Sequence, residues 1–122
     1  MIDHEKIRIL ALSSAAEDYT GLEELLGELE RFPSASKVEK VVAASSVLGS
    51  LVEDGLVELF SGVWPPSHFE PVPKFRAAAL IADPLSWELT SDNSAPYLAF
   101  ASTDAGLEAY RNLPADAFEG LW

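Results

Sequence analysis

The segment from residue 51 to residue 60 constrains the fold most strongly, because it joins the end of a long apolar helix to the start of a strand. Gly55 suits the left-handed backbone conformation that commonly ends a helix, and residues 56–60 alternate weakly between apolar and polar types. Near the other end of the chain the order is reversed, since a strand over 97–101 leads into a helix capped by Thr103. We therefore expect helices and a short sheet to share one fold.

Three helices are expected before that glycine. The first starts at Asp3, whose side chain can accept backbone N–H groups, and the second starts at Thr20, which forms a capping box with Glu23. Ser34 or Ser36 caps the third, whose apolar positions cover more than half of its circumference. We expect the third helix to be mostly buried through Val38, Val41, Val42, Ala44, Val47, Leu48, Leu51 and Val52.

A proline-rich stretch follows the first strand. Residues 61–73 contain four prolines, which remove backbone donors and fix backbone angles, so an irregular, extended loop is expected there. Residues 74–82 have helical composition, and the Asp83–Pro84 pair starts a further turn with Asp as its cap and Pro in its first position. Leu85 and Trp87 are expected to anchor this turn in the core.

Composition and charge restrict the function. The chain has 122 residues, of which 48% are hydrophobic, and this predicts a single globular domain over 1–122. Its net charge of −12 repels phosphate polyanions and favours a basic protein partner over a nucleic acid. Because the chain lacks cysteine, disulfides and thiol chemistry are excluded, which fits the cytoplasm. No apolar run approaches the ~20 residues that cross a bilayer, so no membrane partner is expected.

The succession helix, helix, helix, strand, loop, strand, helix resembles the winged-helix superfamily, in particular the MarR-like and PadR-like bacterial regulators. Residues 51–60 are similar to the end of their recognition helix and the first wing strand, and residues 99–113 to their second wing strand and final helix. The resemblance implies an α+β fold with a three-helix core, a small antiparallel sheet and, in this chain, a long proline-rich wing loop.

The same resemblance implies a DNA-binding surface, formed by Ser34, Ser36, Lys37, Lys40, Lys74 and Arg76. Residues 34–76 carry a net charge of only −1, against −11 for the rest of the chain, which supports this alternative. However, the outward face of the third helix offers no Arg, Asn or Gln to read base edges, since its residues are Glu39, Ala43, Ser46, Ser50, Glu53 and Asp54. Protein binding is therefore placed ahead of DNA binding, and a nucleic-acid mimic or an immunity-type inhibitor is a further version of it.

Two aromatic clusters are candidate contacts. Trp64, His68 and Phe69 lie in the proline-rich segment, where rigid rings on a preorganised loop favour protein binding, although packing over the core explains them equally well. Near the end of the chain, a second set either docks on its own domain or makes a homodimer contact. That set is Phe118, Leu121 and Trp122.

No catalytic pattern is present. His4 and His68 have no acidic residue at a metal-ligand spacing, and the chain has no glycine-rich phosphate loop and no nucleophile elbow. We therefore expect a non-catalytic, macromolecule-binding protein with no metal and no cofactor.

Overall fold

The computed structural model describes residues 3–32, 34–62, 69–88, 97–114 and 116–117. The helices of this part are α1 (His4–Glu17), α2 (Leu22–Glu28), α3 (Lys37–Glu53), α4 (Lys74–Ala82) and α5 (Asp104–Arg111), with short 3₁₀ helices η1 (Leu29–Arg31) and η2 (Pro84–Trp87). Its strands are β1 (Thr20–Gly21), β2 (Val57–Gly62), β3 (Glu70–Pro71) and β4 (Tyr97–Ser102). The expected α+β class is confirmed.

Local capping explains where two of the long helices begin. The Asp3 side chain accepts the backbone N–H of Glu5 at 2.9 Å, which satisfies a donor at the start of α1. At the start of α3, the Ser36 hydroxyl accepts the N–H of Glu39 at 3.1 Å, so Ser36, not Ser34, is the cap. Gly55 has a φ of 76°, as expected of the residue that ends α3 and turns the chain into β2.

The strands form one antiparallel sheet in the order β1-β4-β2-β3. The two long central strands, β2 and β4, pair with Leu59 opposite Phe100 and Phe60 opposite Ala99. At one edge β3 adds only two residues, and Pro71 is tolerated there because an edge strand has a side that needs no hydrogen-bond donor. The expectation of irregular chain throughout 61–73 is therefore wrong at both ends, since β2 extends to Gly62 and β3 pairs with it.

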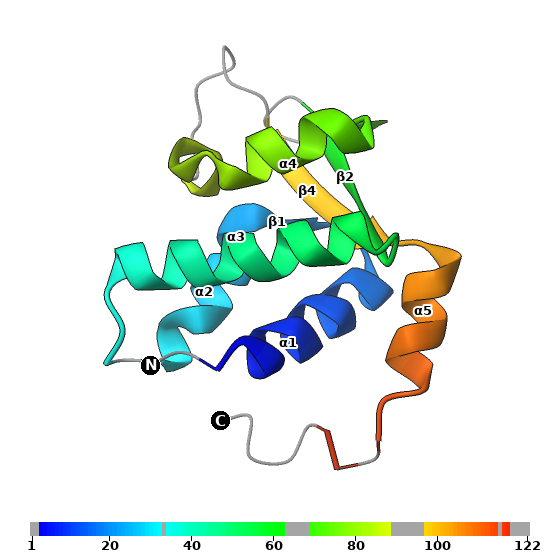
Figure 1. Ribbon diagram of the computed structural model, residues 1–122, viewed down its shortest axis with the longest axis horizontal. Coiled ribbons are helices and arrows are strands. Elements are labelled where there is room, and N and C mark those ends of the chain that lie inside the picture. Colours follow the sequence, from blue (N-terminus) through cyan, green and yellow to red (C-terminus); the bar gives the residue numbers. More distant parts are fainter. Residues whose placement is uncertain (1–2, 33, 63–68, 89–96, 115, 118–122) are drawn as a thin grey trace.

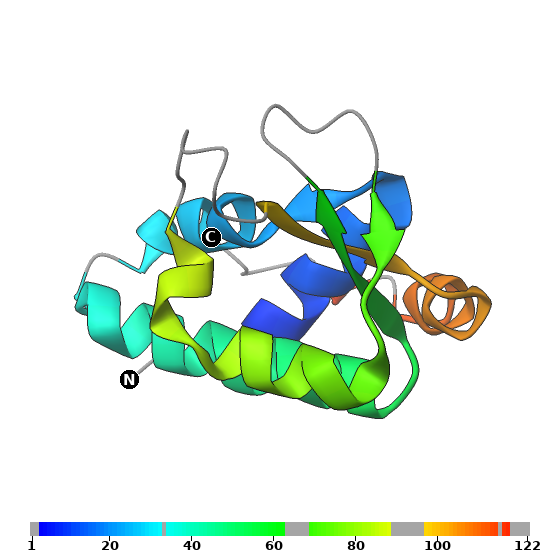
Figure 2. The ribbon, with the colours of Figure 1, turned by 90° about the horizontal axis from the view of Figure 1, so that it is seen from above.

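α3 and α4 pack in front of the sheet as seen in Figure 1. α3 lies in the middle, with α4 along one side and α1 along the other, and Figure 2 shows the sheet on the far side of α3 and α4. Their shared core is nearly or completely closed to solvent, with Ile7, Leu12, Leu48, Leu59, Phe100 and Trp87 each at most 1% exposed. Burial of such side chains is the main favourable term in folding.

α4 runs antiparallel to α3. Glu88, just after η2, has its Oε1 atom 3.7 Å from Nζ of Lys37 at the start of α3. At the opposite end, Lys74 lines a small open cavity together with Gly55, which follows α3. α4 confirms the helix expected over 74–82. The two contacts place it directly beside α3.

Some expected core positions are exposed. Val38 and Val42 at the start of α3 are 72% and 61% exposed, and Leu85 in η2 is 72% exposed. Their predicted burial is wrong, because apolar spacing identifies a helical arc but not which turns of that arc have a neighbour. Conversely, Ala43 was expected to face outward and is buried. The predicted anchoring role of Trp87 is confirmed.

The start of the second helix also differs from expectation. Thr20 does not cap it, since Thr20 is a buried residue of β1 paired with Phe100. α2 starts at Leu22, and the backbone N–H of Gly21 donates to Glu24 Oε1 at 3.4 Å. A β-branched threonine fits a half-buried strand well, and here the strand preference prevails over the capping pattern.

Candidate functional site

The outer face of the sheet carries aromatic side chains. Successive residues of a strand point to opposite faces, so burial of Leu59 and Phe100 in the core turns Phe60, Tyr97 and Ala99 to the other face. In an ordinary one-sided antiparallel sheet this face would be polar. Its aromatic residues therefore need a structural or functional explanation.

These aromatic rings form a cluster that we call the sheet-face cluster: Tyr19, Phe60, Phe69 and Tyr97. Tyr19 stacks on Phe69 with ring centroids 4.7 Å apart, and it meets Phe60 edge to face at 5.0 Å. Phe69 also lies 6.1 Å from Tyr97. Such contacts stabilise aromatic pairs beyond the area they bury. Tyr19 remains 45% exposed, so the cluster presents a ring to solvent.

Tyr97 ties the sheet-face cluster to the start of α2. Its hydroxyl donates to Glu23 Oε1 at 2.7 Å, and Glu24 Oε1 lies 3.4 Å away. Burial, and then the Glu23 carboxylate, raise the pKa of the Tyr97 hydroxyl well above its usual value, so it stays a hydrogen-bond donor at neutral pH. A Cβ atom at position 21 would meet both this hydroxyl and Glu23, so Gly21 leaves the space in which they pair.

An acidic groove borders the exposed ring of Tyr19. Four carboxylates line it, and none of the described residues lining it is a lysine or an arginine. The lining residues are Ser14, Glu17, Asp18, Tyr19, Thr20, Glu24 and Glu28. Clustered charge of one sign raises the local concentration of the opposite sign. The groove and the neighbouring ring therefore suit a ligand that is both cationic and apolar.

The structure places one of the three predicted protein-binding residues in this site. Phe69 is half-buried within the sheet-face cluster. Trp64 and His68 lie outside the described residues, as do Phe118, Leu121 and Trp122, the predicted oligomer contacts. Sequence reasoning missed Tyr19, Phe60 and Tyr97. The signal for Phe60 and Tyr97 was the two-residue alternation of β2 and β4, which puts both side chains on the outer face.

The residues named for DNA binding do not form one cationic surface. Lys40 is only 8% exposed, with its Nζ atom 3.7 Å from Glu30 Oε2, and Lys37 is paired with Glu88 at the same distance. Ser36 is engaged as the cap of α3. The other three residues, Ser34, Lys74 and Arg76, are exposed, and the last two belong to α4.

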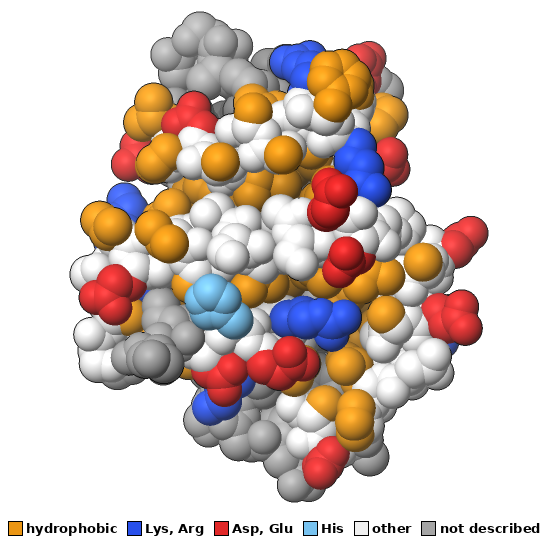
Figure 3. All heavy atoms as spheres, in the orientation of Figure 1, with side chains coloured by type: hydrophobic (Ala, Val, Ile, Leu, Met, Phe, Trp, Pro, Cys, Tyr) orange, Lys and Arg blue, Asp and Glu red, His pale blue; other side chains and the backbone are white. Residues whose placement is uncertain are grey.

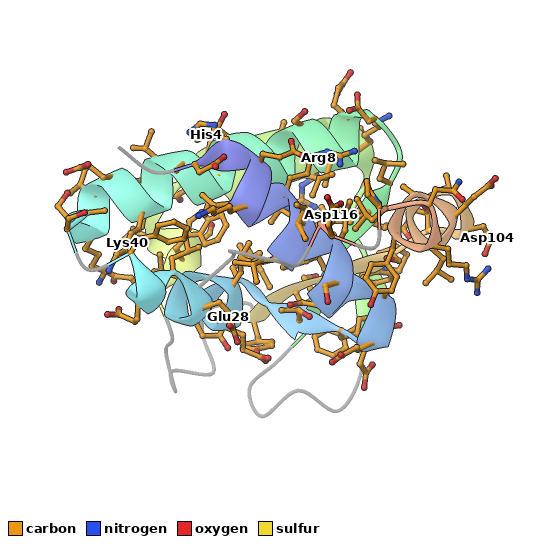
Figure 4. All side chains as sticks on the ribbon, turned by 90° about the horizontal axis from the view of Figure 1, so that it is seen from below. His4, Arg8, Glu28, Lys40, Asp104 and Asp116 are labelled. Carbon is orange, nitrogen blue, oxygen red and sulfur yellow. The ribbon has the colours of Figure 1, made fainter. Side chains whose placement is uncertain are left out.

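A second groove separates α1 from α3. It is lined by His4 and Arg8, which Figure 4 shows on α1 beside α3, together with Ser46 and Ser50 of α3 and their neighbours. In the described part of the chain, no group of three or more His, Asp or Glu side chains is placed to hold a metal ion. Within the same residues, no helix has the length and apolar character needed to span a bilayer.

Comparison of the chain with protein-family models, curated proteins and solved structures gives no match. The arrangement of the described residues defines an α+β fold that has an aromatic, acid-bordered sheet face.

Proposed function

We propose that this protein is a non-catalytic, cytoplasmic protein-binding domain on a winged-helix scaffold, and that it recognises a basic, partly apolar segment of another protein. The recognition surface is the sheet-face cluster with the acidic groove beside it. The observation that carries the proposal is the exposed ring of Tyr19, stacked on Phe69 and bordered by Glu17, Asp18 and Glu24.

The order of elements supports the winged-helix scaffold. Three helices are followed by β2, a long connection, β4 and a final helix, and β4 lies between β1 and β2 in the sheet. α4 occupies the connection between β2 and β4, where a wing loop would lie, and it packs against α3. A fold of this kind serves many activities, so the function rests on the surface and not on the fold.

The chemistry of the surface matches a basic segment. A lysine or arginine over the face of a tyrosine gains a cation–π interaction, and nearby carboxylates add charge complementarity. Rings already packed against one another lose little conformational freedom on binding. A net charge of −12 further favours approach of a positively charged partner.

The proposal predicts binding of a fluorescein-labelled peptide that alternates arginine and leucine, measured by fluorescence anisotropy at 0.1 M salt. Replacing the rings together, Tyr19→Ala with Phe69→Ala, should weaken binding at least about tenfold, because central aromatic contacts dominate interface energies. The control Phe75→Ala removes a ring that is 81% exposed on α4, and it should leave the affinity unchanged. Circular dichroism checks that each variant folds.

The electrostatic contribution has its own matched pair of variants. Glu17→Gln with Glu28→Gln removes two charges from the acidic groove, and Glu53→Gln with Glu108→Gln removes two exposed charges from α3 and α5. Only the first pair should slow peptide association at low salt, and the difference should shrink at high salt because of screening. Equal binding of an acidic control peptide, or unchanged binding after both rings are removed, would refute the proposal.

Regulation through DNA is the second candidate, and the two exposed cations Lys74 and Arg76 in the first turn of α4 favour it. It predicts an electrophoretic shift of genomic fragments at low salt that is lost when both residues are replaced by alanine. Absence of any shift would remove this candidate.

A further inference from the structure

α4 and the start of α3 share an exposed apolar surface that we call the α4 face. Its large members are Phe75, Val38, Leu85 and Val42, which are 81%, 72%, 72% and 61% exposed. The exposed residues Ala78, Ala79 and Ala82 of α4 join them. Figure 3 shows hydrophobic side chains gathered over α4 and over the adjoining end of α3.

α4 is apolar on both sides. Its inner side buries Ala77 and Ile81 and partly buries Leu80, whereas its outer side carries Phe75 and the three exposed alanines. A helix that is apolar all round is normally buried. In a chain with 28 charged residues, an exposed apolar face of this kind marks an interaction surface.

The charged residues at the two ends of α4 oppose the dipole of that helix. Lys74 and Arg76 lie in the first turn of α4, where the helix dipole favours acidic residues, and Asp83 follows the last turn, where it favours basic ones. The charge at each end of α4 therefore opposes the helix dipole. A second helix in the opposite direction would bring a charge of the favourable sign to each end. Residues 74–88 contain two basic and two acidic side chains, so this segment has no share in the net charge of −12.

We infer that the α4 face binds a second copy of this chain, with the two α4 helices antiparallel about a two-fold axis near Ala79. In this arrangement Arg76 faces Asp83 of the partner subunit, and the same pair repeats on the other side of the axis, as an isologous interface requires. The small side chains at the centre allow the two helices to approach closely, and Phe75 packs toward Leu85 of the partner subunit. Because the 74–88 segment has no net charge, two chains that are acidic elsewhere can meet there with little repulsion.

Sedimentation equilibrium of the whole chain tests self-association. The wild-type chain should show a monomer–dimer equilibrium, and Ala79→Glu should raise the dissociation constant at least about tenfold, because it buries two carboxylates at the axis. Glutamate is a good helix former at this exposed position, so the monomer should stay folded. Ala105→Glu places the same charge on an exposed site of α5 and should leave the equilibrium unchanged.

Mixing two charge variants tests the antiparallel direction. Arg76→Glu alone and Asp83→Lys alone each create two repulsive pairs in a homodimer, so each should be monomeric. An equimolar mixture should form a heterodimer, because both of its charge pairs are then attractive. Asp83 also caps η2 by accepting the N–H of Leu85 at 3.0 Å, so circular dichroism of the second variant is needed.

A single introduced cysteine gives an independent readout, since the chain has none of its own. Ala79→Cys should cross-link to a covalent dimer on mild oxidation, and Ala105→Cys should not. The inference fails if the wild-type chain is monomeric at every concentration, or if it dimerises equally well with Ala79→Glu. It is independent of the proposed peptide site, because the residues replaced within that site, Tyr19, Phe69, Glu17 and Glu28, lie outside the α4 face.

Discussion

Replacing Trp87 by alanine should lower the free energy of unfolding by about 3–5 kcal/mol, a large part of the roughly 5–15 kcal/mol that holds a typical domain together. Trp87 is 1% exposed, so its removal leaves a large cavity in the core. Its indole N–H donates to the carbonyl of Ile81 at 2.8 Å, and that buried acceptor would lose its partner. The side chain thereby joins η2 to the end of α4 and holds both against the helices beneath.

Leu85→Ala is the matched control for this prediction. Leu85 lies two residues away in the same 3₁₀ helix but is 72% exposed in the single chain, so its truncation should change the stability of the monomer by no more than about 0.5 kcal/mol. Urea denaturation followed by circular dichroism measures both variants. A loss below about 1 kcal/mol for Trp87→Ala would mean that η2 is not anchored as the structure has it.

Signals that act within a few residues were predictable from the sequence. Asp3, Thr103 and Asp83 cap the elements that follow them, and Gly55 has the positive φ that its place after a long apolar helix suggested. Each of these involves a side chain and a backbone group two or three residues apart, or the backbone of a single residue. The α+β class followed from the same local signals.

Features that depend on which elements become neighbours were not predictable in this way. Val38 and Val42 have the spacing of core residues, yet the side of α3 that carries them has no covering element among the described residues. Thr20 has the spacing of a cap, yet its pairing with Phe100, 80 positions away in the sequence, places it in a strand. Periodicity reports what a helix or strand could bury, and tertiary contacts decide what it does bury.

The residues of the candidate site show the same difference between local signals and long-range contacts. Phe69 was predicted from its place in an aromatic, proline-rich segment, which is a local property. The hydrogen bond from Tyr97 to Glu23 spans 74 residues, and the stack of Tyr19 on Phe69 spans 50. No spacing rule connects residues this far apart, and only the pairing of β1, β4, β2 and β3 brings them to one face.

Gly106→Ala should destabilise the fold by about 2–4 kcal/mol, although alanine is normally the better helix residue. A Cβ atom at this position would overlap the backbone carbonyl of Leu56, and a carbonyl held in the turn before β2 cannot move aside as a long side chain can. Leu56 O already accepts the backbone N–H of Thr103 at 3.2 Å, and the Thr103 hydroxyl accepts the N–H of Gly106 at 3.0 Å. The clash would therefore disturb the cap of α5 as well as the turn.

Gly49→Ala is the same chemical change, but it should stabilise the fold. Gly49 lies inside α3, and apart from its chain neighbours and the nearby backbone of α3 itself, no heavy atom of the described residues lies within 4 Å of where its Cβ would be, so alanine should stabilise the fold by about 0.5–1 kcal/mol. Thermal unfolding of the two variants measures the contrast. If both substitutions stabilised the chain, helix propensity alone would govern position 106, and the close contact between α5 and the turn before β2 would be refuted. Opposite signs would show that α5 is held by backbone contact with the segment 55–56, which also ends the central helix of the fold.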